Sequence, residues 1–149
     1  MAKPTTLPAG DFLIKLESSE GSGVFTAPCG LTSKGFNQSA TTQETVVPDC
    51  DDPDAPASVE RAVDALSGEI SGSGVLAMGS RNTYETWYRS GLKKKCRIYL
   101  DTTLANSGGY WEGYFLLTQW NVTAQRGQKI NTELTMQSDG DIAWTDADA

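Results

Sequence analysis

The chain has 149 residues, which is long enough for one domain with a substantial core. Its net charge of −7 argues against a nucleic-acid-binding surface built from Lys and Arg, and the absence of histidine excludes Ser-His-Asp and Cys-His catalysis. Hydrophobic residues make up 38% and glycines number 15, which suits a β protein with much polar surface or with surface buried between subunits.

The sequence also bears on compartment and redox state. No stretch approaches the length of a membrane span, and Met1–Leu7 lacks the apolar core of a signal peptide. We therefore expect no membrane association and a protein that is made and kept in the cytosol. Cys29, Cys50 and Cys96 cannot all pair within one chain, and in that compartment reduced thiols are expected.

The first third of the chain predicts antiparallel strands. Asp11–Glu17 alternates with apolar residues at its even positions, which is the pattern of a half-buried strand. Val24–Ala27 is expected to pair back on it as a hairpin. Leu31–Phe36 continues this meander, and the β-branched run Thr41–Val47 indicates a further strand.

A long loop is predicted from residue 47 to residue 66. This run is acidic and contains three prolines, which cannot serve a central sheet ladder. Loops of this length are usually functional or disordered, and we expect Ser58–Leu66 to form a helical turn or two on docking. The residues of this loop that are candidates for facing a partner are Pro48, Asp49, Asp51, Asp52, Pro53, Asp54, Glu60 and Arg61.

A strand and the only predicted helix follow the loop. Leu66–Leu76 carries apolar residues or glycine at even positions and mostly small polar residues at odd ones. A helix is predicted over Arg81–Ser90, capped by Ser80 or Asn82 and ended by Gly91. The aromatic stripe expected to dock this helix on a sheet consists of Tyr84, Trp87 and Tyr88.

The rest of the chain predicts more strands, over Lys94–Thr102, Tyr110–Thr123, Lys129–Gln137 and Ile142–Trp144, before a frayed tail at Thr145–Ala149. In the longest of these, the side chains expected on one side are Tyr114, Leu116, Trp120 and Val122. The sequence thus predicts a single domain over residues 1–149. Its class is mostly β (α+β), a β-sandwich or barrel with one flanking α-helix and a long inter-strand loop.

Two motifs that suggest ligands fail on inspection. Gly72–Ala77 matches the G-x-G-x-x-A pattern, but its strand alternates and lysines stand near the position where a dinucleotide site needs an acidic residue. The cluster Asp49–Asp54 could suggest calcium, but Pro53 and Pro56 occupy places where ligands or glycine should stand. No catalytic residue, metal or cofactor is predicted.

The basic run Lys93, Lys94 and Lys95 has two interpretations. It is either a solvated strand edge or a docking patch for the acidic loop of a neighbouring subunit. Exposed charge pairs contribute only about 0–1 kcal/mol each. Such a match would therefore set register more than affinity.

The order of these parts carries a resemblance that spans nearly the whole chain. A strand with the sequence TTQETV precedes the long loop, ISGSGV at Ile70–Val75 precedes the helix, and GYFLLTQW at Gly113–Trp120 leads to a final strand ending in SDGDI. In this order the chain resembles the major tail (tail tube) proteins of long-tailed bacteriophages and gene transfer agents.

The resemblance implies a structural virion protein of the tail, assembled in the host cytoplasm. Six copies would close a ring, rings would stack into a tube, and the long loop would reach the adjacent ring. DNA would pass through the lumen without specific binding, and the partners would include tape measure, terminator and distal tail proteins. Independently, exposed strand edges favour closure with identical neighbours, and head-to-tail contacts polymerise.

A lumen that conducts DNA should avoid contacts between Lys and phosphate, because each would hold the DNA. The small polar sides of two predicted strands meet this requirement. The candidate lumen residues are Ser67, Glu69, Ser71, Ser73, Asn131, Glu133, Thr135 and Gln137.

Two other functions compete with the tube. A β-sandwich that binds carbohydrate or a receptor would need an exposed aromatic platform, for which Tyr110 and Trp111 are candidates. Another ring-forming tail protein, such as a terminator or connector, would close a ring without stacking. An enzyme ranks last, since no acid/base pair is apparent. Solution size separates these hypotheses, because a sugar-binding module should remain monomeric.

Overall fold

The computed structural model describes residues 3–18, 21–28 and 30–147. Within these residues, eight strands form one antiparallel sheet in the order β2-β1-β5-β6-β7-β4-β3, and β8 pairs with β6. The elements are β1 (Phe12–Glu17), β2 (Phe25–Thr26), β3 (Leu31–Val47), β4 (Ser58–Val75), α1 (Met78–Ser90), β5 (Lys94–Leu100), β6 (Gly109–Thr123), β7 (Asn131–Ser138) and β8 (Ala143–Asp146). The mostly-β class with one α-helix is confirmed for this part of the chain.

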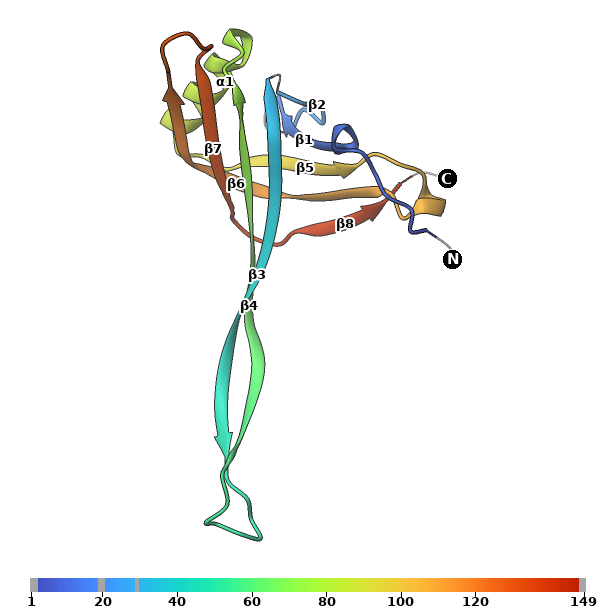
Figure 1. Ribbon diagram of the computed structural model, residues 1–149, viewed down its shortest axis with the longest axis vertical. Coiled ribbons are helices and arrows are strands. Elements are labelled where there is room, and N and C mark those ends of the chain that lie inside the picture. Colours follow the sequence, from blue (N-terminus) through green and yellow to red (C-terminus); the bar gives the residue numbers. More distant parts are fainter. Residues whose placement is uncertain (1–2, 19–20, 29, 148–149) are drawn as a thin grey trace.

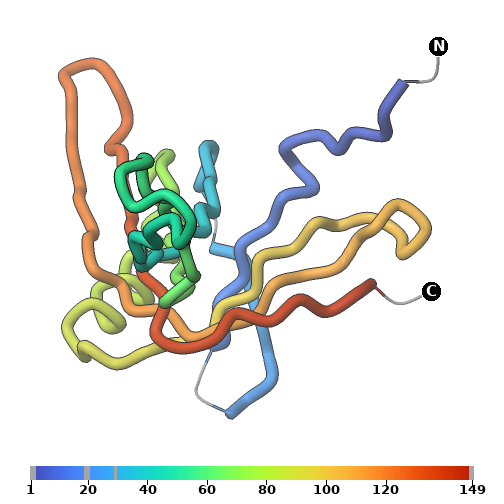
Figure 2. Tube along the Cα trace, turned by 90° about the horizontal axis from the view of Figure 1, so that it is seen from below, coloured from blue at the N-terminus to red at the C-terminus, as the bar shows by residue number. Residues whose placement is uncertain are grey.

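The sheet is folded across β6. The first part of this strand pairs with β5 and β8, and the second part pairs with β7. In Figure 1, β5 and β8 run crosswise to β3 and β4, and the two sets of strands lie in different directions. Figure 2 shows α1 and the β6–β7 connection on one side of the molecule and both chain ends on the other.

The core lies between these two parts of the sheet and is closed by α1. Its buried members come from five strands and the helix, so strands distant in sequence share one interior. They are Ile14, Leu16, Ile70, Tyr84, Trp87, Cys96, Ile98, Phe115, Leu117, Leu134 and Met136. Full burial of one large apolar side chain contributes about 1.5–3 kcal/mol, so this interior is the main source of stability.

The β3–β4 hairpin extends far beyond this body as an arm (Figure 1). β3 and β4 pair from Leu31 opposite Gly74 to Val47 opposite Ser58, so only residues 48–57 connect them. The predicted loop over 47–66 and the helical turn over Ser58–Leu66 are therefore wrong, because residues 58–66 are strand. The two strands predicted between Leu31 and Val47 are one continuous strand.

The helix is longer than the sequence predicted. It begins at Met78 with Ala77 as N-cap, and no side chain caps it, so the predicted caps at Ser80 and Asn82 are wrong. It ends, as predicted, at Gly91, which takes the left-handed conformation with φ 66° that glycine adopts without strain.

The docking face of α1 is narrower than predicted. Tyr84 and Trp87 are buried, whereas Tyr88 is 43% exposed. The Tyr84 ring lies 6.1 Å from that of Trp120 in β6, and the indole N–H of Trp87 donates to the carbonyl of Leu92 at 2.9 Å. The second contact fixes the direction in which the chain leaves the helix.

The predicted one-sided apolar set in β6 is also wrong. Phe115 and Leu117 face the core, and Leu116 lies on the opposite face beside Gln137. A bulge at Thr118, between the paired residues Leu117 and Gln119, then shifts the alternation by one residue, which brings Trp120 to the core side. Strict alternation cannot anticipate such a shift.

The C-terminal strand is longer than predicted. β8 includes Thr145 and Asp146, which were expected in a frayed tail, and Asp148 and Ala149 lie outside the described residues. Cys50 is an exposed free thiol and Cys96 a buried one, while Cys29 lies outside the described residues. Burial raises the pKa of the Cys96 thiol. No helix in the described part of the chain has the length and apolarity to cross a membrane.

Candidate assembly surfaces

The predicted lumen residues of β4 and β7 lie side by side on one face of the sheet. Three cross-strand pairs bring them together: Glu69 with Gln137, Ser71 with Thr135, and Ser73 with Glu133. Directly opposed residues in antiparallel strands share a face, so these six side chains form one surface. Asn131 continues it at the end of β7, opposite Val75.

Strands β3 and β6 widen this surface on both sides, which sequence reasoning missed. Ser39 opposes Ser67, and their hydroxyls lie 2.9 Å apart. On the other side, Asn121 of β6 opposes Glu133. We define the polar face as Ser33, Asn37 and Ser39 of β3, Ser67, Glu69, Ser71 and Ser73 of β4, Asn131, Glu133, Thr135 and Gln137 of β7, and Gln119, Asn121 and Thr123 of β6.

The members of the polar face are all polar, and the apolar residues Leu116 and Val75, which oppose Gln137 and Asn131, border it. The polar face spans four strands, contains no Lys or Arg, and carries only the charges of Glu69 and Glu133. Two shallow hollows lie on it, with volumes of about 210 and 440 Å³. Such a face offers phosphate groups no cationic partner and repels them at two points.

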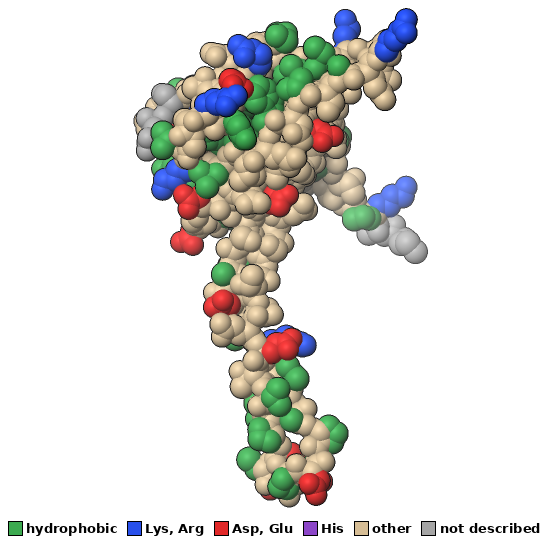
Figure 3. Space-filling model, turned by 90° about the vertical axis from the view of Figure 1, so that its left-hand side faces the viewer, with side chains coloured by type: hydrophobic (Ala, Val, Ile, Leu, Met, Phe, Trp, Pro, Cys, Tyr) green, Lys and Arg blue, Asp and Glu red, His purple; other side chains and the backbone are tan. Residues whose placement is uncertain are grey.

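The arm carries an apolar stripe on one side. Its members, Val46, Val59, Val63 and Leu66, are 65%, 46%, 63% and 76% exposed. Val46 opposes Val59, and the cross-strand salt bridge from Arg61 Nε to Glu44 Oε1, 3.0 Å long, lies between the valines. Hydrophobic side chains are visible along the arm in Figure 3. Exposed apolar side chains grouped in this way mark an interaction site.

A bulge at Asp64 aligns the stripe with the core-facing side of the sheet. β3 has no extra residue there, so its even positions from Phe36 to Val46 keep one face. In β4 the pairing passes from Ala65 directly to Val63, and Asp64 is the extra residue. The stripe therefore continues the side of the sheet that carries Ile70 inside the body.

Aspartates shape the turn at the tip of the arm. Asp49 Oδ1 accepts the backbone N–H groups of Asp51 at 2.9 Å and Asp52 at 3.4 Å, and Asp52 Oδ1 accepts that of Asp54 at 3.2 Å. These are local Asx-type contacts, which fix a turn without secondary structure. Of the predicted contact residues, Pro48, Asp49, Asp51, Asp52, Pro53 and Asp54 lie in this turn, and Glu60 and Arg61 lie in β4.

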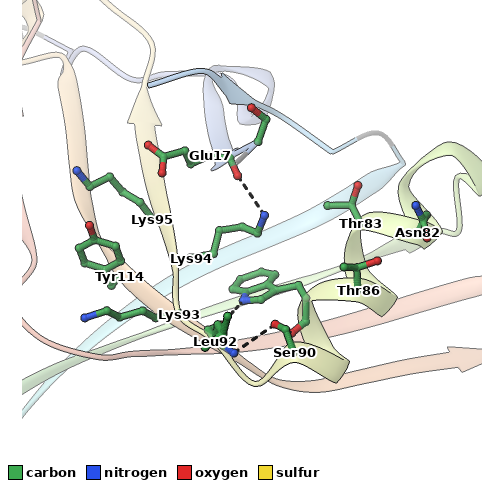
Figure 4. A pocket seen from close by; sticks show the side chains of 12 residues that line it. Glu17, Asn82, Thr83, Thr86, Ser90, Leu92, Lys93, Lys94, Lys95 and Tyr114 are labelled. Carbon is green, nitrogen blue, oxygen red and sulfur yellow. Dashed lines mark hydrogen bonds between the residues drawn. The ribbon is translucent and has the colours of Figure 1, made fainter. Parts of the chain in front are cut away.

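The predicted lysine patch lines a groove of about 360 Å³ between α1, β6 and the start of β5 (Figure 4). Lys94 Nζ donates to the carbonyl of Glu17 at 3.1 Å, and Lys95 Nζ lies 3.4 Å from Glu112 Oε1. Lys93 Nζ lies 4.7 Å from the centre of the Tyr114 ring. We define the lysine groove as the hollow lined by Lys93, Lys94, Lys95, Tyr114, Thr86 and Ser90 with their neighbours.

A charged cluster joins β5 to β6 beside this groove. Arg97 Nε donates to Glu112 Oε2 at 2.6 Å, and the guanidinium lies 3.9 Å from the Phe25 ring and 4.6 Å from the Tyr110 ring. Burial alone would raise the pKa of Glu112, but the hydrogen bond and charge of Arg97, together with Lys95, outweigh it and lower that pKa. The carboxylate is therefore held in its charged form.

The aromatic platform that a carbohydrate-binding module would need is already engaged within the chain. Trp111 lies 5.2 Å from the Phe36 ring and 4.8 Å from the Trp144 ring, and it packs against the core. The Tyr110 ring lies 4.9 Å from that of Tyr99 and also contacts Arg97. These contacts give the platform a structural role.

Comparison with solved structures gives the same fold in tail assemblies. The chain is similar to a protein of the tail of an empty gene transfer agent particle, with 21% identity over 94% of this chain and 99% of that one, at a TM-score of 0.77. It is similar to a chain of a native gene transfer agent virion, with 20% identity over 94% and 99% and a TM-score of 0.73. For the SPP1 tail tube the values are 10% identity, 95% and 80% coverage, and 0.68.

Sequence comparison identifies a family but no individual curated relative. None of the curated protein sequences matches this chain significantly. A family model described as phage tail tube protein matches residues 7–143, which is nearly the whole chain. The chain therefore belongs to the phage tail tube protein family, whose members are structural components of the virion tail.

Proposed function

We propose that six copies of this chain close a ring, that rings stack head to tail into the tail tube, and that the polar face lines the channel through which DNA passes. The observation that carries the proposal is the arm with its exposed apolar stripe, which lies outside the core of its own chain. The ring number is supported by the C6 symmetry stated for the similar gene transfer agent tail.

The length of the arm fits a contact between copies. β4 pairs with β7 only from Glu69 onward, and Gly68 is already buried against the body, so the segment from Ser58 to Ser67 extends outside it. At about 3.3 Å per residue this is a reach of roughly 33 Å. An isolated two-stranded hairpin is at best marginally stable in water, so a neighbouring copy stabilises the arm by covering its stripe.

The polar face suits the channel because it contains no Lys or Arg that could bind the phosphates of DNA. Contacts between Lys or Arg and phosphate release counterions and supply most non-specific affinity for DNA. A four-stranded face without a cation gives a smooth, weakly repulsive wall. The role is structural and not catalytic, and the ends of the tube meet the tape measure, terminator and distal tail proteins.

Electron microscopy of the purified protein tests the proposal. The wild-type chain should form rings or tubes. A variant in which residues 43–62 are replaced by an Asn-Gly turn, joining Thr42 to Val63, should fold but not form tubes. The matched control keeps the arm and exchanges Gln43 and Thr45, on the other side from the stripe, for serine. A wild-type protein that stays monomeric at every concentration, alone and with tail initiator proteins, would overturn the proposal.

A further inference from the structure

Charge is divided unequally between the arm and the body. From residue 40 to residue 66 the acidic side chains are Glu44, Asp49, Asp51, Asp52, Asp54, Glu60 and Asp64, and Arg61 is the one basic residue of that range. The tip turn itself, residues 48–57, carries four aspartates and no cation. In Figure 3 most basic side chains lie on the body, and the end of the arm shows acidic and hydrophobic ones.

The lysines of the lysine groove have hydrogen-bond donors that their own chain does not use. An ammonium group has three donors, and Lys94 uses one on the Glu17 carbonyl and Lys95 uses one on Glu112. Lys93 is in no salt bridge among the described residues, and its ammonium lies over the Tyr114 ring at the mouth of the groove. Thr86 of α1 adds a hydroxyl group to the wall, whereas the hydroxyl of Ser90 already donates to the carbonyl of Trp87 at 2.7 Å.

One acidic side chain also lines the groove and reduces its positive charge. Glu17 lines it, and Glu17 Oε1 accepts the backbone N–H of Gly21 at 3.0 Å. Glu17 is 6% exposed, whereas Lys93 is exposed at the surface. Glu112 already compensates the charge of Lys95, so Lys93 and Lys94 against the buried carboxylate of Glu17 leave the groove positive toward an incoming group.

We propose that the lysine groove of one copy receives the acidic tip turn of another copy's arm. This inference rests on the proposed tube, because it names the seat of the arm within it. The tip cannot reach the groove of its own chain, since the tip and α1 lie at opposite ends of the molecule (Figure 1). A contact that uses different surfaces on the two copies is open-ended, so it propagates a stack.

The two acidic residues best placed for this contact are Asp51 and Asp54. Asp49 and Asp52 use carboxylate oxygens to hold the turn, whereas the carboxylates of Asp51 and Asp54 make no such contact with backbone N–H groups among the described residues. The first pair shapes the tip, and the second pair meets the lysines. Opposite charges in such a contact set register and exclude wrong docking.

Charge exchange between the two surfaces tests this inference. The tip variant carries Asp51→Lys and Asp54→Lys, and the groove variant carries Lys93→Glu and Lys94→Glu. Each should need a roughly tenfold higher protein concentration for tubes, which corresponds to about 1.4 kcal/mol. The variant with all four substitutions, in which the charges are opposite again, should regain most of the lost assembly. Lys93→Glu alone, which breaks no hydrogen bond or salt bridge recorded among the described residues, is the second groove variant.

Matched controls carry the same change in net charge elsewhere. Asp101→Lys with Asp146→Lys matches the tip variant, and Lys129→Glu before β7 matches Lys93→Glu alone; all three residues are exposed. These should assemble like the wild type. Wild-type tubes together with an unaffected tip variant would overturn the docking and leave the tube intact. A defective groove variant beside a normal tip variant would assign the groove to another occupant and also overturn it. Failure of the wild type to form tubes would instead refute the proposed function.

Discussion

At the scale of single residues, close packing between β3 and β4 depends on Gly74. A β-carbon at this position would lie 2.1 Å from the carbonyl oxygen of Gly30 and 2.7 Å from the backbone nitrogen of Thr32. Both neighbours are backbone atoms, which cannot rotate away as a side chain can. The close approach of β3 therefore requires glycine at position 74.

This predicts opposite outcomes for two Gly→Ala substitutions. Gly74→Ala should lower the free energy of unfolding by about 1–3 kcal/mol, because the backbone of β3 must move. Gly79→Ala, in the first turn of α1 with open space around it, should leave stability unchanged or raise it by up to about 1 kcal/mol. Urea unfolding of each purified variant measures both. Equal effects of the two substitutions would contradict the close approach.

The Arg97–Glu112 pair gives a prediction about pH. The pKa of Glu112 is lowered in the folded protein, so the pair contributes stability above the unfolded pKa of about 4.3, and this is lost as pH falls through the folded value. Glu112→Gln should cost about 1 kcal/mol at pH 7 and little at pH 2. Thermal unfolding across this range measures the difference, with Glu85→Gln on the outer surface of α1 as control. A cost independent of pH would contradict this account.

At the scale of elements, the arm shows that a bulge can give the sequence of a strand the apolar spacing of a helix. Apolar residues at 59, 62, 63 and 66 follow the i, i+3, i+4, i+7 spacing of an amphipathic helix. In the structure they belong to β4, where the extra residue Asp64 shifts the alternation between Val63 and Leu66. A strand with one bulge and a short helix are indistinguishable in a window of this length.

Where no bulge interrupts a strand, alternation in the sequence predicts which side chains share one face of the sheet. The polar positions of β4 from Ser67 to Ser73 and those of β7 were identified from their period of two, and the register places them together. The contributions of β3 and β6 depend on which strands are neighbours and in what register. Strand neighbours and register are set by contacts between distant parts of the chain, which alternation does not show. In β6 the bulge also interrupts the alternation, so its polar positions cannot be read from a period of two.

The stripe predicts a contrast between two adjacent valines. Val46→Ser, on the stripe, should raise the protein concentration needed for tubes several-fold, because it leaves a polar group in a buried contact between copies. Val47→Ser, on the other side of the arm opposite Ser58, should change it little. Both should alter the free energy of unfolding of the unassembled chain by less than about 0.5 kcal/mol, since both residues are outside the core.

Light scattering during assembly measures the first quantity, and urea unfolding below the assembly concentration measures the second. Loss of monomer stability in Val46→Ser would show that the valine supports its own chain, and the stripe would then need no partner. An equal assembly defect in both variants would assign the contact to the whole arm and not to one side of it.

At the scale of the whole molecule, the polar face, the arm and the lysine groove divide the surface by charge. The face is neutral to acidic, the tip is acidic and the groove is basic. Since the proposed ring contacts and the proposed channel wall use different surfaces, charges can be changed on one without altering the other. This separation allows the proposed channel wall to be tested in assembled tubes.

Lysines placed on the polar face should make the assembled tubes retain DNA. Glu69→Lys with Glu133→Lys introduces two lysines per copy where the wild type has none, and neither glutamate is in a salt bridge within the described residues. Tubes assembled from this variant in the presence of DNA should retain it, with an affinity that falls steeply as salt rises. Wild-type tubes should retain none. The control is Asp101→Lys with Asp146→Lys, which makes the same change in net charge after β5 and in β8, away from the face.

Nuclease protection decides where the DNA lies. DNA held by lysines in the channel is enclosed by protein, so it should sediment with the tubes and survive nuclease treatment. Retained DNA that is digested would place Glu69 and Glu133 on the outside of the tube and refute the assignment of the channel wall. Equal, protected retention by the control variant would show that net charge alone, and not the position of the lysines, holds the DNA. Protection specific to the face variant can arise only if these four strands surround the path of the DNA.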